Sequence, residues 1–342
     1  MKITDIRACQ PTCASPPGWR TSLGQILVAI EADGGITGYG VGGGGLSGVH
    51  IIRTVLRDLL IGQNTEPVEF IWQLMYEATL PFGRKGVAIM ALSGVDLALW
   101  DLRGKAANKS VAQLLGGPIH ASVPAYATVW DDIPESSLGE YGAFKVHLGK
   151  CDGGLESLVD AAARARERIG AEAALMIDAW MKWDVPFTRR FADRVLPLRI
   201  DWIEEPLPPD DLAGYGELVR DCPIPIAGGE HEFTAAGFAP IIERRLHHIV
   251  QPDACWCGGM TELVKIYRLG KQHGVRVCPH RGGEIWGLHA LAALDPQPLA
   301  ESGRAWLTWI GGQPPITDGR IEVPAAPGFG AVIEESRLSY VN

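Results

Sequence analysis

Three acidic residues, Asp178, Glu204 and Glu230, each close a short apolar run, and successive members of the set are 26 residues apart. A strand, a helix and two short loops of a parallel α/β protein take about that length, so the three side chains are expected at one end of three neighbouring strands. Carboxylates that converge on one point repel each other unless a cation lies between them. The spacing therefore predicts a metal site. Mg²⁺ fits it best, because this ion prefers oxygen ligands and keeps positions open for substrate oxygens.

An aspartate and a histidine close two later runs of the same kind, Asp253 in Gln251-Pro-Asp and His280 in Cys278-Pro-His. A lone histidine would by default be a core residue that a backbone carbonyl satisfies. Here a carboxylate is expected on the adjacent strand end, where it would fix the tautomer of the imidazole and stabilise the imidazolium. This pairing suits a general base that works near neutral pH. We therefore predict that Asp253 and His280 form a catalytic dyad.

Ionisable residues also close the second and eighth runs. Lys145 and His147 end the second, and Glu301 ends the eighth. A divalent metal, carboxylate ligands and a histidine base together suit proton abstraction next to a carboxylate, because the dianionic enediolate that forms needs strong charge neutralisation. We predict catalytic roles for Lys145 and Glu301.

Several other side chains near these positions are candidates for substrate contacts. The predicted contacts are His147, Trp180, His231, Arg281, Trp19 and Arg20. The last two lie in a Pro- and Ser-rich loop over residues 11–21, which is either a lid over a site or a solvated connection. Cys255 and Cys257 hint at zinc, but a single Cys-x-Cys without a second pair is a weak signal, so we interpret them as packing residues.

Short apolar runs alternate with helical patterns from residue 118 to about residue 310. Eight runs are predicted strands: Val123–Trp130, Phe144–Leu148, Leu175–Asp178, Trp202–Glu204, Ile224–Ala227, His248–Gln251, Val275–Cys278 and Pro298–Ala300. Eight βα-type units predict an α/β barrel, in which chemistry takes place at the carboxyl ends of the strands. We assign the barrel to residues 118–312. Residues 1–117, with three antiparallel strands and several helices, form an α+β cap, to which residues 313–342 return.

The composition excludes several classes of function. The net charge of −9 argues against a nucleic-acid-binding surface. The seven cysteines are scattered and odd in number, which indicates a reducing compartment rather than a disulfide framework. The first residues lack the apolar core of a signal peptide, and no apolar run has the length of a membrane span. We expect a cytoplasmic protein that acts on a small molecule, without nucleic-acid or membrane partners.

Several motifs together resemble the enolase superfamily, and within it the mandelate racemase/muconate lactonizing enzyme-like branch. They are Ser93-Gly-Val-Asp-Leu-Ala-Leu-Trp-Asp-Leu, Trp202-Ile-Glu-Glu-Pro, Gly229-Glu and the spacing of the three acids. The resemblance implies a modified (β/α)7β TIM-type barrel under a cap built from both ends of the chain. It also implies one Mg²⁺ held by Asp178, Glu204 and Glu230, the His280–Asp253 dyad, and a homo-oligomer.

Within that branch the chain looks most like the acid-sugar dehydratases, particularly the L-rhamnonate dehydratases. The matching stretches are Asp178-Ala-Trp-Met, Gly229-Glu-His-Glu, Gln251-Pro-Asp-Ala-Cys-Trp-Cys-Gly-Gly, Pro279-His and Pro327-Gly-Phe-Gly. The resemblance implies that His280 takes the C2 proton of a sugar acid and helps the 3-hydroxyl to leave, which gives a 2-keto-3-deoxy acid. It also implies that Glu301, when protonated, donates a hydrogen bond to the enediolate.

Two departures from the branch bear on the activity. The second strand carries Lys145-Val-His147 where the branch often has Lys-x-Lys, which makes a two-base racemase less expected and leaves Lys145 to bind the substrate carboxylate. Arg281 follows the dyad histidine where rhamnonate dehydratases carry small residues. The alternatives are a sugar-acid epimerase or lactone cycloisomerase that uses the same enediolate, and a binding protein that has lost catalysis.

Overall fold

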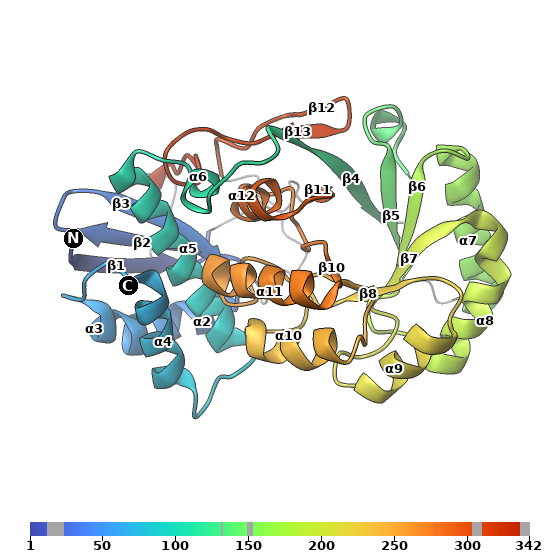
Figure 1. The fold of residues 1–342 in the computed structure, drawn as a ribbon, viewed down its shortest axis with the longest axis horizontal. Helices are drawn as coiled ribbons and strands as arrows, with labels where there is room; N and C mark the ends of the chain where they lie inside the picture. The colour runs from blue at the N-terminus through green and yellow to red at the C-terminus, as the bar shows by residue number, and fades with distance from the viewer. Residues whose placement is uncertain (12–23, 131–132, 149–152, 303–309, 336–342) are drawn as a thin grey trace.

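The cap begins with three antiparallel strands, as the sequence predicts. In the computed structural model, which describes residues 1–11, 24–130, 133–148, 153–302 and 310–335, these are β1 (Ile3–Cys9), β2 (Ile26–Ala32) and β3 (Thr37–Gly42), in the order β1-β2-β3. The β1–β2 and β2–β3 pairs are both antiparallel, and the Asp-Gly-Gly signal lies at the predicted turn between β2 and β3. Figure 1 shows this sheet at one end of the molecule, with the parallel strands toward the other.

Helices cover one side of the cap sheet. They are α2 (Gly45–Ile51), a π-helical segment (Ile52–Leu56), α3 (Arg57–Leu60), α4 (Val68–Thr79), α5 (Val87–Ala107) and α6 (Val111–Leu114). The glycine run 42–45 ends β3 and begins α2, and Gly44 adopts a left-handed conformation at the helix N-terminus (φ 87°). Helix α5 is buried on almost every side because it packs between the cap sheet and the barrel.

All eight predicted strands of the second unit are confirmed, with ends that shift by one or two residues. They are β4 (Ser122–Trp130), β5 (Ala143–His147), β6 (Ala174–Asp178), β7 (Ile200–Glu204), β8 (Ile226–Gly228), β9 (Ile249–Val250), β10 (Arg276–Val277) and β11 (Ala300–Ser302). Parallel ladders run from β4 through to β10 in chain order, and β11 pairs in parallel with β4. Between β10 and β11 the described residues form no ladder, but Gly283 N–H donates to the carbonyl of Glu301 at 2.7 Å.

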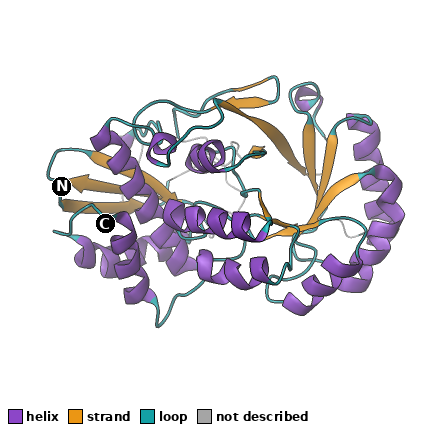
Figure 2. Ribbon diagram, viewed as in Figure 1, coloured by secondary structure: helices purple, strands orange, loops and turns teal. Residues whose placement is uncertain are grey.

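Helices alternate with these strands, as a βα repeat requires. They are α7 (Gly154–Ile169), α8 (Val185–Val195), α9 (Leu212–Asp221), α10 (Thr234–Glu243), α11 (Gly259–His273) and α12 (Ile285–Leu294), with short 3-10 turns at Glu135–Ser137 and Leu196–Leu198. Figure 2 shows α7, α8 and α9 on the outer side of the strands. Inward side chains such as Tyr126, Met176 and Trp202 fill the space between the strands. Within the described ranges, no helix combines the length and the apolar surface that crossing a bilayer requires.

The C-terminal segment does not behave as a single return to the cap. Its first part forms a hairpin of β12 (Ile316–Thr317) and β13 (Arg320–Glu322), and β13 pairs antiparallel with β4, so it extends the barrel sheet. The later part contacts the cap: Phe329 N–H donates to Asp101 at 2.9 Å, and Glu335 pairs with Arg7 at 3.0 Å. The domain limits at residues 117/118 and 312/313 stay a prediction.

The close approach of β3 to α5 depends on glycine. A Cβ on Gly40 would lie 2.2 Å from the carbonyl oxygen of Gly94 and 2.4 Å from the nitrogen of Ala98, both of them backbone atoms of α5. Gly40→Ala is therefore expected to destabilise the protein by about 1–3 kcal/mol through overpacking, as measured by urea unfolding. Gly216→Ala in α9 is the matched control, since its Cβ would meet its nearest neighbour at 3.5 Å. A Gly40→Ala protein as stable as the control would contradict this account of the packing.

Asp96 joins the cap to the barrel and is expected to make stability depend on pH. Its two carboxylate oxygens accept from Thr261 N–H at 2.9 Å and from Thr261 Oγ1 at 2.6 Å. Burial raises the pKa of Asp96 from 3.8 to about 7. The folded state thus holds this proton more tightly than the unfolded chain, so the stability that Asp96 contributes is complete below its unfolded pKa and is lost as pH rises through about 7.

Comparison with Asp96→Asn measures this effect. The difference in unfolding free energy between the two proteins should move in favour of the variant between pH 5 and pH 8, as determined from urea unfolding at about half-unit steps of pH. Parallel pH profiles for the two proteins would contradict the assignment.

Candidate active site

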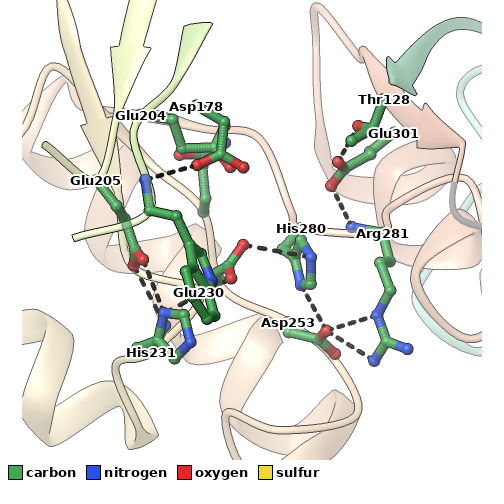
Figure 3. A network of polar contacts seen from close by, with 12 residues as sticks. Thr128, Asp178, Glu204, Glu205, Glu230, His231, Asp253, His280, Arg281 and Glu301 are labelled. Carbon is green, nitrogen blue, oxygen red and sulfur yellow. Dashed lines mark hydrogen bonds and ion pairs between the residues drawn. The ribbon is translucent and has the colours of Figure 1, made fainter. Parts of the chain in front are cut away.

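The three acids predicted as metal ligands lie at the carboxyl ends of adjacent strands. Asp178 closes β6 and Glu204 closes β7, where the two are paired in register, and Glu230 follows β8. All three are buried, with exposed fractions of 4%, 1% and 7% in that order. Figure 3 shows their carboxylates near one another on the same side of the site, with that of Glu230 turned toward His280. The 26-residue spacing thus brings the three side chains to one region of the fold.

The electrostatics of this acidic group favour a cation. Burial, followed by the charge of Glu204, raises the pKa of Asp178 well above its usual value. Burial also raises the pKa of Glu230, to which the charges of Glu205 and Glu204 contribute. The oxygen-rich donor set and the mutual repulsion of these carboxylates are what a hard divalent cation relieves. The residues present therefore fit Mg²⁺.

The most compact metal-ligating group is not the predicted one. Among the described residues, Glu205, Glu230 and His231 each offer a ligand atom within 4.8 Å of the others. Asp178 and Glu204 stand outside this group, and of the predicted trio only Glu230 belongs to it. Glu205 accepts from His231 Nδ1 at 2.7 Å, and although burial opposes it, this bond holds the pKa of Glu205 below its usual value. The ligand assignment to Asp178, Glu204 and Glu230 thus stays a prediction.

Lys145 contacts Glu204 and Asp178, the two predicted ligands outside that group. Its ammonium donates to Glu204 and lies 2.9 Å from Glu301 Oε1 and 3.9 Å from Asp178 Oδ2. Burial alone would lower the pKa of Lys145, but the charges of Glu204 and Glu301 raise it well above its usual value. Glu204 also accepts from Gln251 Nε2 at 2.6 Å. The lysine is therefore a fixed cation among three carboxylates in this structure.

Glu301 is ionised in this arrangement. It accepts from Thr128 Oγ1 and, at 2.7 Å, from the backbone N–H of Arg281. Although burial opposes ionisation, the charge of Lys145 lowers the pKa of Glu301 to about 2. Lys145 and two hydrogen-bond donors thus favour the carboxylate form, and donation by a protonated Glu301 to an enediolate stays a prediction.

His280 and Asp253 lie together, as the sequence predicts for a dyad. His280 Nδ1 is 2.8 Å from Asp253 Oδ2, and His280 Nε2 is 3.3 Å from Glu230 Oε2 (Figure 3). Burial alone would lower the pKa of His280, but the neighbouring charges of Glu230, Glu301 and Asp253 raise it to about 10. One ring nitrogen thus faces the dyad carboxylate, and the other faces the acidic group.

The other predicted substrate contacts are distributed around the site. His147 and Trp180 lie beside the acidic group opposite the dyad, with His147 Nε2 3.7 Å from Asp178 Oδ2 and the two rings 6.0 Å apart. Trp180 N–H donates to Asp178 Oδ1 at 2.9 Å. His231 is in contact with Glu205 and Glu230. Trp19 and Arg20 fall outside the described residues.

Arg281 contacts the dyad carboxylate, and its predicted contact with the substrate is not tested by the structure. It is 3% exposed, and its Nε donates to Asp253 Oδ2 at 2.9 Å, so its guanidinium is directed at the dyad carboxylate. A residue directly after a histidine at a strand end is expected to reach the substrate only if its backbone keeps the direction of the strand. Here Arg281 has a left-handed backbone conformation (φ 51°), which turns the side chain back.

The sequence reasoning missed Trp256. Its ring lies 5.4 Å from that of His280 and 6.0 Å from that of His231, and its indole nitrogen would be 3.1 Å from a Cβ on Gly43 of the cap. The sequence feature that could have indicated Trp256 is its place between Cys255 and Cys257, three residues after the dyad aspartate Asp253. Burial raises the pKa of both thiols well above the usual value, as expected for packing residues.

The comparisons with known proteins identify the family. Residues 16–116 match the mandelate racemase/muconate lactonizing enzyme N-terminal domain, and residues 135–337 match the enolase C-terminal domain-like family. The chain belongs to the mandelate racemase/muconate lactonizing enzyme branch of the enolase superfamily. This membership confirms the predicted combination of an N-terminal capping domain and a C-terminal barrel-like domain.

Particular relatives point more narrowly. The chain is 36% identical over 323 residues to the L-rhamnonate dehydratase of Saccharopolyspora erythraea, which covers 90% of this chain and 83% of that protein. Its fold is similar to that of rhamnonate dehydratase from Gibberella zeae complexed with Mg (TM-score 0.89, 28% identity, 99% of this chain and 96% of that chain). It is also similar to the 3,6-anhydro-D-galactonate cycloisomerase of Zobellia galactanivorans (TM-score 0.88, 29% identity, 99% and 100%).

Proposed function

We propose that this protein is a Mg²⁺-dependent hydro-lyase that converts a sugar acid into a 2-keto-3-deoxy acid. The observation that carries the proposal is the placement of His280 between Asp253 (2.8 Å) and the Glu230 carboxylate (3.3 Å), beside a buried acidic group. A base held next to a cation-binding group is what abstraction of a proton α to a carboxylate requires. The sequence identity of 36% and 35% to two proteins named as L-rhamnonate dehydratases, over most of the chain, supports a dehydration.

The metal would be held by Asp178, Glu204 and Glu230, with Glu205 and His231 next to them. When bound, Mg²⁺ supplies a Lewis acid that polarises the substrate carboxylate and offsets the carboxylate charges around His280. Lys145 lies against Glu204, one of the residues that would hold the ion. The role that we propose for the lysine is to bind the substrate carboxylate.

The dyad carries the proton transfers. Asp253 accepts from His280 Nδ1, which fixes the tautomer and leaves Nε2 to take the proton from C2 of the substrate. The electron pair of the broken C2–H bond forms the enediolate, and elimination then breaks the C3–O bond, so that the 3-hydroxyl leaves as water with a proton returned by His280. The resulting enol takes a proton at C3 and releases the proton of its 2-hydroxyl, and so becomes the 2-keto-3-deoxy acid.

A second activity is an epimerisation or cycloisomerisation through the same enediolate. The observation that favours it is His147, which lies against Asp178 on the side opposite the dyad and offers a second imidazole. The similarity of fold to a cycloisomerase of an anhydro sugar acid agrees with this alternative. Assembly into a homo-oligomer and a cytoplasmic location stay predictions.

A substrate screen tests the proposal. The purified protein is incubated with Mg²⁺ and a panel of mono- and diacid sugars, and 2-keto acids are detected as semicarbazones. We expect at least one aldonate to give a semicarbazone-positive product and the signal to disappear when Mg²⁺ is chelated. A panel in which acids are consumed without any 2-keto product would favour the isomerase, and a panel in which no acid is consumed would contradict both activities.

A further inference from the structure

Arg281 follows the dyad histidine in the chain and turns back onto its partner. Its backbone is left-handed (φ 51°), a conformation that a residue with a Cβ keeps only when its surroundings determine it. The turn directs Nε and Nη2 to Asp253 Oδ2 at 2.9 and 2.8 Å, the same oxygen that His280 Nδ1 approaches at 2.8 Å. The second oxygen, Oδ1, accepts from Cys255 N–H at 2.6 Å. Three hydrogen-bond donors, Arg281 Nε, His280 Nδ1 and the N–H of Cys255, thus surround one carboxylate, and Nη2 of Arg281 lies beside them as an ion-pair contact.

The same residue contacts two further parts of the site. Its backbone N–H donates to Glu301 Oε2 at 2.7 Å, and its guanidinium lies 5.2 Å from the centre of the Trp256 ring. Trp256 in turn stands beside His280. Arg281 is therefore connected to the dyad acid, the eighth-strand acid and an aromatic residue next to the base, although it is almost completely buried.

We infer that Arg281 is a positioning residue, which holds the Asp253 carboxylate in the orientation that directs His280 Nε2 toward the reacting carbon, and that it does not contact the substrate. This inference rests on the proposed function. A planar guanidinium suits the role because its Nε–H donates to the carboxylate while the plane of the group holds Nη2 beside the same oxygen, an arrangement that an ammonium on a flexible stem does not reproduce. Since proton transfer depends on alignment, loss of this alignment acts on the chemical step rather than on substrate binding.

The test compares Arg281→Lys and Arg281→Ala with Arg190→Ala, an exposed arginine on α8. We expect kcat to fall by roughly 10²-fold in both Arg281 variants with KM within about twofold of wild type. The kcat and KM of Arg190→Ala should remain at the wild-type values. Methylguanidine added to Arg281→Ala should restore part of kcat, a result that a purely structural role would not produce. A raised KM with unchanged kcat would show a substrate contact and overturn the inference.

A spectroscopic readout separates this inference from the proposed function. In protein labelled with ¹⁵N-histidine, the Nδ1–H resonance of His280, assigned by its absence from His280→Asn, reports the bond to Asp253 without any substrate. We expect this resonance to shift or broaden in Arg281→Lys, and in Arg281→Ala if that variant folds, and to stay unchanged in Arg190→Ala. An unchanged resonance in a folded Arg281→Lys overturns the inference whatever the activity is. A shifted resonance in a protein that turns over no sugar acid leaves the positioning role intact and removes only the proposed function.

Discussion

Replacement of His280 by asparagine is expected to lower kcat for the sugar-acid reaction by roughly 10²- to 10⁴-fold, the range that a positioned general base contributes. The physical reason is that Nε2 of His280 is the group that faces the acidic cluster, while Nδ1 is already bound to Asp253. Asparagine can keep a hydrogen bond to Asp253 but has no basic nitrogen. The measurement is the steady-state rate together with the exchange of the substrate C2–H for deuterium in D₂O.

Two observations make the result decisive. His50→Asn, at an exposed position of α2, should leave both rates at the wild-type value. Circular dichroism and thermal unfolding establish that His280→Asn is folded. If the variant still exchanges C2–H at the wild-type rate, the base is another group, and His147 on the opposite side of Asp178 becomes the first candidate.

Removal of the metal is expected to lower the rate about as much as the replacement of His280 by asparagine. Chelation should reduce activity to background, and Mg²⁺ should restore it, because the enediolate carries charge that the chain's own residues do not neutralise alone. Binding of the ion also stabilises the folded state: at an Mg²⁺ concentration of about 100 times Kd, the free energy of unfolding rises by about 2.7 kcal/mol. The measurement is urea unfolding with and without Mg²⁺, beside the rate.

Ligand variants then decide which residues hold the ion. Asp178→Asn is expected to lose both the Mg²⁺-dependent rate and the Mg²⁺-dependent gain in stability, whereas Asp58→Asn, whose side chain is 81% exposed, should lose neither. Glu205→Gln is the informative comparison, because Glu205 belongs with Glu230 and His231 to the compact group. Loss of metal response in Glu205→Gln with its retention in Asp178→Asn would assign the ion to that group instead of the predicted trio.

Much of the fold follows from the sequence because βα repeats leave a periodic pattern. Each of the eight runs is a strand in the structure, and Asp178 and Glu204, which close two of them, are paired in register at the carboxyl ends of β6 and β7. The place of the hairpin β12–β13 was less predictable, because a local pattern does not record which strand a hairpin pairs with. Whether so short a hairpin joins the cap or pairs with β4 depends on tertiary contacts that no local pattern records.

The candidate site was predictable by position but not by side-chain direction. Spacing placed Lys145, Glu204 and Glu301 at strand ends, yet it gave no sign that the ammonium would lie between the two carboxylates. Arg281 shows the same limit: its left-handed backbone is unusual for arginine, and the sequence pattern gave no sign that its side chain would contact Asp253. Trp256 was missed because it reaches the site from a turn after β9 rather than from a strand end.

The position of deuterium in the product distinguishes dehydration of the sugar acid from its epimerisation. The reaction is run in D₂O with Mg²⁺ and the best acid of the panel, and the product is examined by ¹H NMR. A dehydratase whose enol is protonated by solvent-derived deuterons gives a 2-keto-3-deoxy acid with deuterium at C3 and no C2 proton. A product that keeps its 3-hydroxyl and carries deuterium at C2 would contradict the dehydratase and identify an epimerase.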